Sequence, residues 1–273
     1  MVIVMNRNEL MDIIKSRRSV RTFDGKQVTK EDRDKLQNFC DSLTNPFHVP
    51  VEFQLLDPKE HGLKSPVLSG ETLYLAAKVK NQPMCDVAFG YAFEAAVLFA
   101  ESIGLGTAWL GATMNRDAFE RAIELKADEI MPCVTPVGYK ADRMSMREVM
   151  MRKGYQSDTR LSLAEIAFDE EYGKSFDAER DRELTDILEM VRWAPSAVNK
   201  QPWRIIVTGK NVHFYEKPVS IDAADLQRID IGIAMYHFAC GLEAYGKDYS
   251  VNVNDPKKAL PGGVEYIASF IVA

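Results

Sequence analysis

The chain has 273 residues, of which 46% are hydrophobic and 27% charged, and its 34 basic and 40 acidic side chains give a formal charge of -6. This length is enough for two linked units, and burying this much apolar surface offsets the entropy lost on folding, which excludes a largely disordered chain. The net negative charge argues against non-specific binding to nucleic acid, because such binding depends on a basic face.

No segment predicts a membrane span or a signal peptide. The longest apolar stretch, residues 87–100, is shorter than the roughly 20 residues that cross a bilayer, and it contains Glu94. Positions 6 to 9 are polar, so the first ten residues lack the apolar run of a signal peptide. The four cysteines are far apart and form no CxxC pair, which predicts reduced thiols and a cytoplasmic protein.

Helical patterns recur along the chain at nearly constant spacing. Residues 29–43 predict an amphipathic helix capped by Thr29, and the same apolar pattern starts again from Asp177. A more apolar helix is predicted from Asp86, with a counterpart from Asp230. Two matched pairs in the same order indicate duplication of one α+β unit. Coincidence is the alternative, because amphipathic helices are common.

Strand-like runs accompany both sets of helices. They are VEFQLL, TLYLAAKV and PCVTPVGY in the first part of the chain, then WRIIVTG, NVHFYEK and EYIASFIVA in the second. Residues 209–211 separate two of the later runs and predict a hairpin turn. The polar stretch 152–160 is the predicted join. It divides the chain into a first unit of residues 1–151 and a second unit of residues 152–273.

Residues 16–21 (SRRSVR) form a dense set of hydrogen-bond donors after an apolar helical run. Arg17, Arg18 and Arg21, with the hydroxyl of Ser19, suit a phosphate or another planar anion. The alternative is a solvated helix end, where arginines complement the negative pole of the helix dipole.

Residues 194–203 (APSAVNKQPW) follow the second amphipathic helix. Pro195 is expected to end that helix, and Ser196, Asn199 and Gln201 then offer polar side chains from a constrained loop. The alternative is an ordinary helix-to-strand turn with Trp203 in the core.

Together these two segments resemble the R-R-S-x-R and A-P-S-x-x-N-x-Q-P-W motifs of the flavin-dependent nitroreductase family. Residues 104–111 (GLGTAWLG) and 136–139 (PVGY) resemble two further motifs, and all four occur in the family's order. The resemblance implies an α+β nitroreductase-like fold, with antiparallel-rich sheets packed by helices, and a site for flavin mononucleotide (FMN).

The chain departs from the family in one respect. Family members are typically homodimers in which each subunit carries both site motifs, whereas here the arginine motif occurs only in the first unit and the Pro-Ser loop only in the second. The chain therefore resembles a fused subgroup, in which duplicated halves form a pseudo-dimer within one polypeptide. This implies a monomer that keeps one composite FMN site.

The resemblance also implies which residues bind FMN. Arg17, Arg18 and Ser19 would contact the phosphate and ribityl chain, and Arg21 would lie near the pyrimidine edge of the ring. Leu110 and Gly111 match the position that faces the flavin N5, and Lys140 and Arg143 match the family's basic phosphate ligands. The second unit would contribute Pro195, Ser196, Ala197, Asn199 and Gln201.

The implied function is an FMN-dependent oxidoreductase that takes hydride from NAD(P)H and reduces a small electron-poor acceptor, such as a nitroaromatic, a quinone or a free flavin. Because the flavin carries the chemistry, no residue is predicted as a catalytic acid or base. The four histidines have no HxxH or HExxH spacing, which predicts no metal site. The alternatives are a non-enzymatic flavin-binding or sensing module and a structural domain without flavin.

Overall fold

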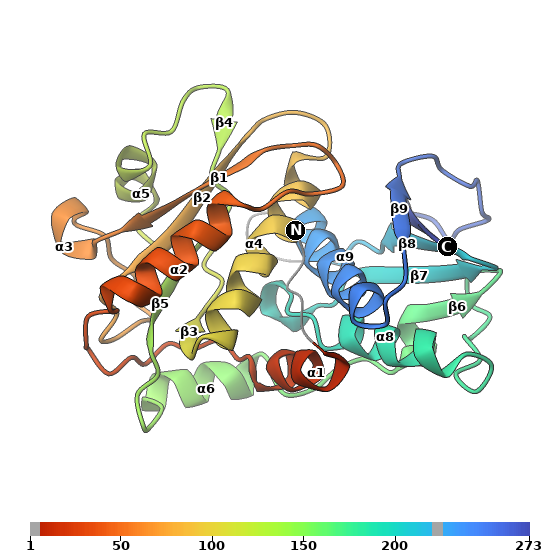
Figure 1. Cartoon of the computed structure of the whole chain (residues 1–273), viewed down its shortest axis with the longest axis horizontal. Coiled ribbons are helices and arrows are strands. Elements are labelled where there is room, and N and C mark those ends of the chain that lie inside the picture. The colour runs from red at the N-terminus through yellow and green to blue at the C-terminus, as the bar shows by residue number, and fades with distance from the viewer. Residues whose placement is uncertain (1–5, 220–225) are drawn as a thin grey trace.

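The computed structural model describes residues 6–219 and 226–273 (Figure 1). Two lobes, each built on a sheet, meet at two long helices that pack side by side in the centre of the molecule, α4 (Cys85–Ser102) and α9 (Gln227–Ala244). Both helices are buried around almost their whole circumference, because each is covered by the other lobe as well as by its own sheet.

The first lobe runs from α1 to α6. Its elements are α1 (Arg7–Ser16), α2 (Lys30–Asp41), β1 (Val51–Leu56), α3 (Pro58–His61), β2 (Tyr74–Lys80), α4, β3 (Leu105–Thr107), α5 (Arg116–Ala122), β4 (Glu129–Ile130), β5 (Val134–Tyr139) and α6 (Met146–Gly154). Its strands are antiparallel in the order β1-β2-β5-β3, and β4 also pairs with β2.

The second lobe runs from α7 to β10. Its elements are α7 (Leu163–Ile166), β6 (Ala167–Asp169), α8 (Arg182–Arg192), a 3-10 turn (Ala197–Asn199), β7 (Trp203–Thr208), β8 (Asn211–Glu216), α9, β9 (Tyr249–Asn252) and β10 (Glu265–Val272). Its strand order is β6-β7-β8-β10-β9, antiparallel except for the parallel pair β6 and β7.

The two lobes share one succession of elements. The order α2, β1, β2, α4, β3, β5 in the first lobe matches α8, β7, β8, α9, β9, β10 in the second. The sheets match as well, because β1-β2-β5-β3 corresponds to β7-β8-β10-β9. Both helix pairs predicted from the sequence therefore occupy equivalent places in the two lobes.

Helices α4 and α9 approach so closely that each places a glycine against the backbone of the other. A Cβ atom at Gly90 would lie 2.1 Å from the carbonyl oxygen of Ile229, and a Cβ atom at Gly232 would lie 2.1 Å from that of Val87. The contact is reciprocal. Gly90 faces Ile229, which lies three residues before Gly232, and Gly232 faces Val87, which lies three residues before Gly90.

We expect Gly90→Ala to lower the free energy of unfolding by about 2 kcal/mol, because the added methyl group forces apart two helices that bury the centre of the core. Urea unfolding followed by circular dichroism measures the change. Gly154→Ala is the matched control, since a Cβ atom there meets nothing within 4 Å and φ is not positive. An unchanged midpoint for Gly90→Ala would show that the crossing has room to relax.

Local signals account for the ends of the amphipathic helices, with one correction. Thr29 caps α2 through the N–H of Asp32, as predicted. Helix α8, however, begins after Asp181, whose carboxylate accepts from the N–H of Leu184, and not at Asp177. Asp177 is held instead in a turn, where its N–H bonds to Asp169 and its carboxylate accepts from the N–H of Glu179.

The hairpin turn is one residue shorter than predicted, and the predicted join begins inside a helix. Thr208 pairs with Asn211, so the turn between β7 and β8 contains only Gly209 and Lys210. The predicted boundary at residues 151 and 152 falls inside α6, which continues to Gly154. The first residues of the polar stretch form the last turn of α6, which begins after Ser145, whose hydroxyl accepts from the N–H of Glu148.

All four cysteines lie in the described ranges as buried free thiols. Within residues 6–219 and 226–273, no helix combines the length and the hydropathy that crossing a membrane would require.

Candidate functional site

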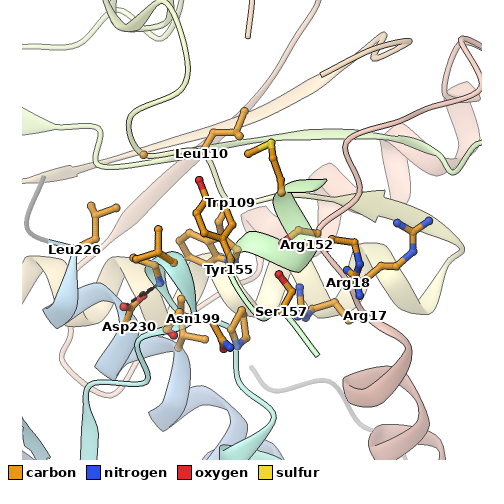
Figure 2. A pocket seen from close by; sticks show the side chains of 18 of the residues that line it. Arg17, Arg18, Trp109, Leu110, Arg152, Tyr155, Ser157, Asn199, Leu226 and Asp230 are labelled. Atoms are coloured by element: carbon orange, nitrogen blue, oxygen red, sulfur yellow. Dashed lines mark hydrogen bonds between the residues drawn. The ribbon is translucent and has the colours of Figure 1, made fainter. Parts of the chain in front are cut away.

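A cavity of about 360 Å³ opens between the two lobes, and both lobes line it. The first lobe contributes the segment after α1, residues 109–113 and the end of α6, and the second contributes residues 193–199 and the start of α9. Figure 2 shows Arg17, Arg18 and Arg152 toward one side of the cavity, and Leu226 and Asp230 toward the other. The labelled cationic side chains thus gather toward one side of the site.

The arginine-rich segment is held in place by the backbone. It leaves α1 with the N–H of Arg17 still bonded to Ile13, and the N–H of Val20 then bonds at 2.8 Å to Thr107 at the edge of β3. Arg17 and Arg21 are buried. Burial lowers the pKa of both guanidinium groups, although nearby carboxylates raise it.

Several guanidinium nitrogens at the cavity have no protein partner. Among the described residues, the buried Nε of Arg17, Nε and Nη1 of Arg21 and Nε of Arg160 make no hydrogen bond. A buried cationic donor without an acceptor is costly, so these atoms favour an anionic ligand that supplies the missing acceptors.

Glu148 on α6 binds the arginine segment at two points. Its side chain is fully buried, one carboxylate oxygen accepts from a guanidinium nitrogen of Arg18, and the other accepts from the N–H of Arg21 at 3.1 Å. Arg18 lines the cavity, but its charge is already paired within the protein.

The join between the lobes forms part of the cavity wall, which the sequence did not indicate. Tyr155, Ser157, Asp158 and Arg160 all line it. The Arg160 guanidinium lies 5.2 Å from the centre of the Trp193 ring. Burial, followed by the nearby charges of Arg17 and Arg192, lowers the pKa of Arg160 to about 10. The only sequence signal was the high density of charge between residues 152 and 160, which is typical of many solvated linkers.

The Pro-Ser loop is backbone-strained and fastened by Asp230. Both carboxylate oxygens of Asp230 accept from the N–H of Ala197 at 3.1 Å. Val198, Asn199 and Gln201 all have positive φ, which is rare for residues other than glycine. Strain of this kind persists where the surrounding structure enforces it, and it concentrates at functional sites.

Asn199 and Gln201 use their side chains to hold the join. The amide nitrogen of Asn199 donates to the carbonyl oxygens of Gln156 (2.8 Å) and Thr159 (3.1 Å). The side-chain oxygen of Gln201 accepts from the N–H of Leu161 at 2.9 Å. The two residues therefore position the segment that carries Arg160.

The structure brings most of the predicted site residues to this one cavity. Those that line it are Arg17, Arg18, Ser19, Arg21, Leu110, Gly111, Pro195, Ser196, Ala197 and Asn199. Gly111 also permits a close approach between the lobes, since a Cβ atom there would lie 2.5 Å from the Leu226 side chain.

Three predicted residues do not line the cavity. Lys140 is drawn to the buried carboxylate of Glu101, with its Nζ 2.6 Å from the carboxylate oxygen. Arg143 is exposed to solvent in the turn before α6, and Gln201 lies behind the Pro-Ser loop. Arg152 and Arg160, from the join, are basic side chains that do line the cavity.

Sequence reasoning missed the apolar wall. Trp109, Leu226, Ile229 and Ile233 line the cavity, and Trp109 is fastened by a 3.0 Å hydrogen bond from its Nε1 to Glu94. With the arginines, these residues suit a ligand that combines an anionic group with a flat apolar body. Within the described part of the chain, no three His, Cys, Asp or Glu side chains gather in a way that could hold a metal ion.

The chain is similar to known nitroreductases. The family model described as "Putative TM nitroreductase" matches residues 9–242. The crystal structure of a putative nitroreductase from Thermotoga maritima is similar over 98% of this chain and 94% of its own, with 22% identity and a TM-score of 0.64. An FMN-dependent nitroreductase from Clostridium difficile R20291 is similar over 52% of this chain and 95% of its own, with 17% identity and a TM-score of 0.42. None of the curated proteins matches the chain.

Proposed function

Because the chain belongs to the nitroreductase family, we propose that it is an FMN-dependent oxidoreductase whose flavin occupies the cavity between the two lobes. NAD(P)H is the proposed donor, and a small electron-poor molecule, such as a nitroaromatic, a quinone or a free flavin, is the proposed acceptor. The observation that carries this proposal is the set of buried, unpartnered guanidinium nitrogens beside an apolar wall.

The donor set fits FMN. A phosphate monoester carries roughly -1.5 to -2 charges near neutral pH and presents three acceptor oxygens. Arg17 and Arg160 offer buried guanidinium donors, and Ser19 offers a hydroxyl beside them. Trp109, Leu110 and Ile229 provide apolar surface for a ring system. The residues of the cavity thus suit both the phosphate and the ring system of FMN.

Each residue has a distinct proposed role. Arg17, Ser19 and Arg160 bind the phosphate, and Arg21 places a cation near the pyrimidine edge of the ring, where it favours negative charge. Glu148 orients the arginine segment, and Asp230 orients the Pro-Ser loop. When bound, FMN supplies the hydride- and electron-transfer chemistry, so the protein contributes binding, orientation and charge.

We further propose that the chain is a fused pseudo-dimer of two nitroreductase-like halves. The α4 and α9 crossing supports this, because its contacts are reciprocal as in a two-fold symmetric interface. The shared succession of elements and the shared strand order support it as well. Since α6 continues to Gly154, we place the boundary between the halves within residues 155–160. Both motifs of the site are then supplied by one chain, which needs no second copy and is proposed to be monomeric.

The proposal predicts one FMN per chain. At the corresponding offset in the sequence, the arginine segment is replaced by residues 165–169, where Glu165 and Asp169 would repel a phosphate. Those carboxylates already serve local structure, since Glu165 caps α7 and Asp169 pairs with Arg180. Titration with FMN, followed by flavin fluorescence or absorbance, should therefore reach saturation at one equivalent. Saturation at two equivalents would contradict the loss of the second site.

Turnover distinguishes an enzyme from a flavin-binding module. Oxidation of NADH or NADPH in the presence of a quinone or nitroaromatic acceptor is expected for the FMN-loaded protein. A protein that binds FMN but oxidises neither donor would support a binding or sensing role. A protein that binds no FMN would overturn the proposed function.

A further inference from the structure

A polar network that the proposed function does not use lies buried where the lobes meet. The side chains of Glu94 on α4 and His237 on α9 are both fully buried, and their Oε1 and Nε2 atoms are 2.9 Å apart. The other carboxylate oxygen of Glu94 accepts from Nε1 of Trp109 at 3.0 Å, and Nδ1 of His237 lies 2.9 Å from the carbonyl oxygen of Met190.

These contacts require a proton between Glu94 and His237. A carbonyl oxygen can only accept, so Nδ1 of His237 must carry a hydrogen toward Met190. Neutral His237 then has a bare Nε2 that faces Oε1, and two bare acceptors at 2.9 Å would repel each other. One further proton, on Nε2 or on the carboxyl group, turns this contact into a hydrogen bond and leaves the pair with no net charge.

Two neighbours of the pair, Trp109 and Arg17, connect it to the cavity. Trp109 lines the cavity wall, and Glu94 is the carboxylate that most strongly supports the charge of the buried Arg17. Other ionisable groups also lie in this region. Glu101 on α4 is bonded to Lys140, Arg152 lies near Arg17, and burial on α9 raises the pKa of the Cys240 thiol.

We propose that the Glu94–His237 pair binds one proton whose retention is coupled to the binding of an anion at Arg17. While the proton is held, the pair is neutral and the charge of Arg17 is available to the ligand. When the proton is lost, the Glu94 carboxylate is left alone and competes for Arg17. Affinity for the anion should therefore be lower when the pair has lost this proton than when the pair holds it. The inference rests on the proposed function, in which the anion is the FMN phosphate.

Calorimetric titration with FMN in buffers of different ionisation enthalpy counts the protons taken up on binding. At a pH at which part of the ligand-free wild-type protein has lost the shared proton, the wild type should take up as much as one proton more on binding than Glu94→Gln. Glutamine keeps the network intact without a shared proton, because its oxygen can accept from Trp109 and its NH2 group can donate to the bare Nε2 of His237. The ionisation of the phosphate itself is common to both proteins and cancels in the comparison.

The two partners should respond in opposite directions. At alkaline pH, Glu94→Gln should bind FMN about tenfold more tightly than the wild type, whereas His237→Gln, which removes the imidazole that shares the proton with Glu94, should bind it about tenfold more weakly at neutral pH. Glu101→Gln is the control, since it also removes a carboxylate near Arg17 but keeps the protonated pair. Its proton uptake should remain that of the wild type.

The outcomes separate the inference from the proposed function. Equal proton uptake by the wild type and Glu94→Gln, with FMN bound by both, would overturn the inference alone. If the wild type binds no FMN, the proposed function fails, and the same titrations with inorganic phosphate test the proton coupling independently. A histidine NMR titration of the ligand-free wild type, compared with Glu94→Gln and with His237→Gln to assign the signal, gives a second readout. Absence of any Glu94-dependent change in the His237 signals would also overturn the inference.

Discussion

Replacing Arg17 with alanine is expected to weaken FMN binding roughly tenfold to a hundredfold. Hydrogen bonds to a charged partner contribute about 1.5–3 kcal/mol, and this range corresponds to that loss of affinity. Arg17 is a buried arginine of the cavity whose Nε has no hydrogen-bond partner among the described residues, and nearby Glu94 and Glu101 favour its charged form. Fluorescence titration of FMN with the variant measures the effect.

Arg143→Ala is the matched control for this experiment. Arg143 is a basic residue that the family resemblance suggested as a phosphate ligand, yet it is exposed and does not line the cavity. Its variant should bind FMN with wild-type affinity. Normal affinity in Arg17→Ala together with weakened binding in Arg143→Ala would refute the assignment of the phosphate to this cavity.

Replacing Glu148 with alanine is expected to lower the free energy of unfolding by about 3 kcal/mol. Breaking a buried ion pair by removing one partner typically costs about 3–5 kcal/mol, and partial exposure of Arg18 places the effect at the lower end. The same change removes the acceptor of the buried Arg21 N–H, so the arginine segment also loses its backbone support. Urea unfolding measures the stability, and FMN titration of the folded variant should show weaker binding.

Asp34→Ala provides the comparison, because Asp34 forms an exposed ion pair with Lys30 on α2 and neither residue lines the cavity. Exposed pairs of this kind contribute little to stability. If Glu148→Ala shifted the unfolding midpoint no more than Asp34→Ala, Glu148 would not be the residue that holds the arginine segment.

Local patterns predicted most of the elements correctly. The apolar spacing of α2, α4, α8 and α9 and the strand-like runs that became β1, β2, β5, β7, β8 and β10 depend on near neighbours in the chain, so they can be recognised without knowing the fold. The beginning of α8 was misplaced because Asp177 and Asp181 both suit an N-cap. The choice between them depends on Asp169, a residue of β6 that binds the N–H of Asp177.

Long-range contacts decided which side chains reach the cavity. Lys140 and Arg143 follow β5 in the order that the resemblance suggested, but the buried carboxylate of Glu101 captures Lys140, and Arg143 lies in a solvent-exposed turn. The sequence places Arg160 in the join between the two units. It reaches the cavity because Asn199 and Gln201 hydrogen-bond the join to the second lobe. These outcomes depend on residues about 40 positions apart in the sequence.

Contiguous residues were enough to predict the long helices, most of the longer strands, the family and the two segments that meet at the cavity, because apolar spacing and motifs depend on near neighbours in the chain. The pairing of Arg18 with Glu148, the place of the join in the cavity wall, and the buried contact of Glu94 and His237 across the lobes follow from the tertiary structure. The physical reason is burial. The charge and the hydrogen bonds available to a side chain depend on which distant groups exclude water from it, and the crossing of α4 and α9 brings those groups together.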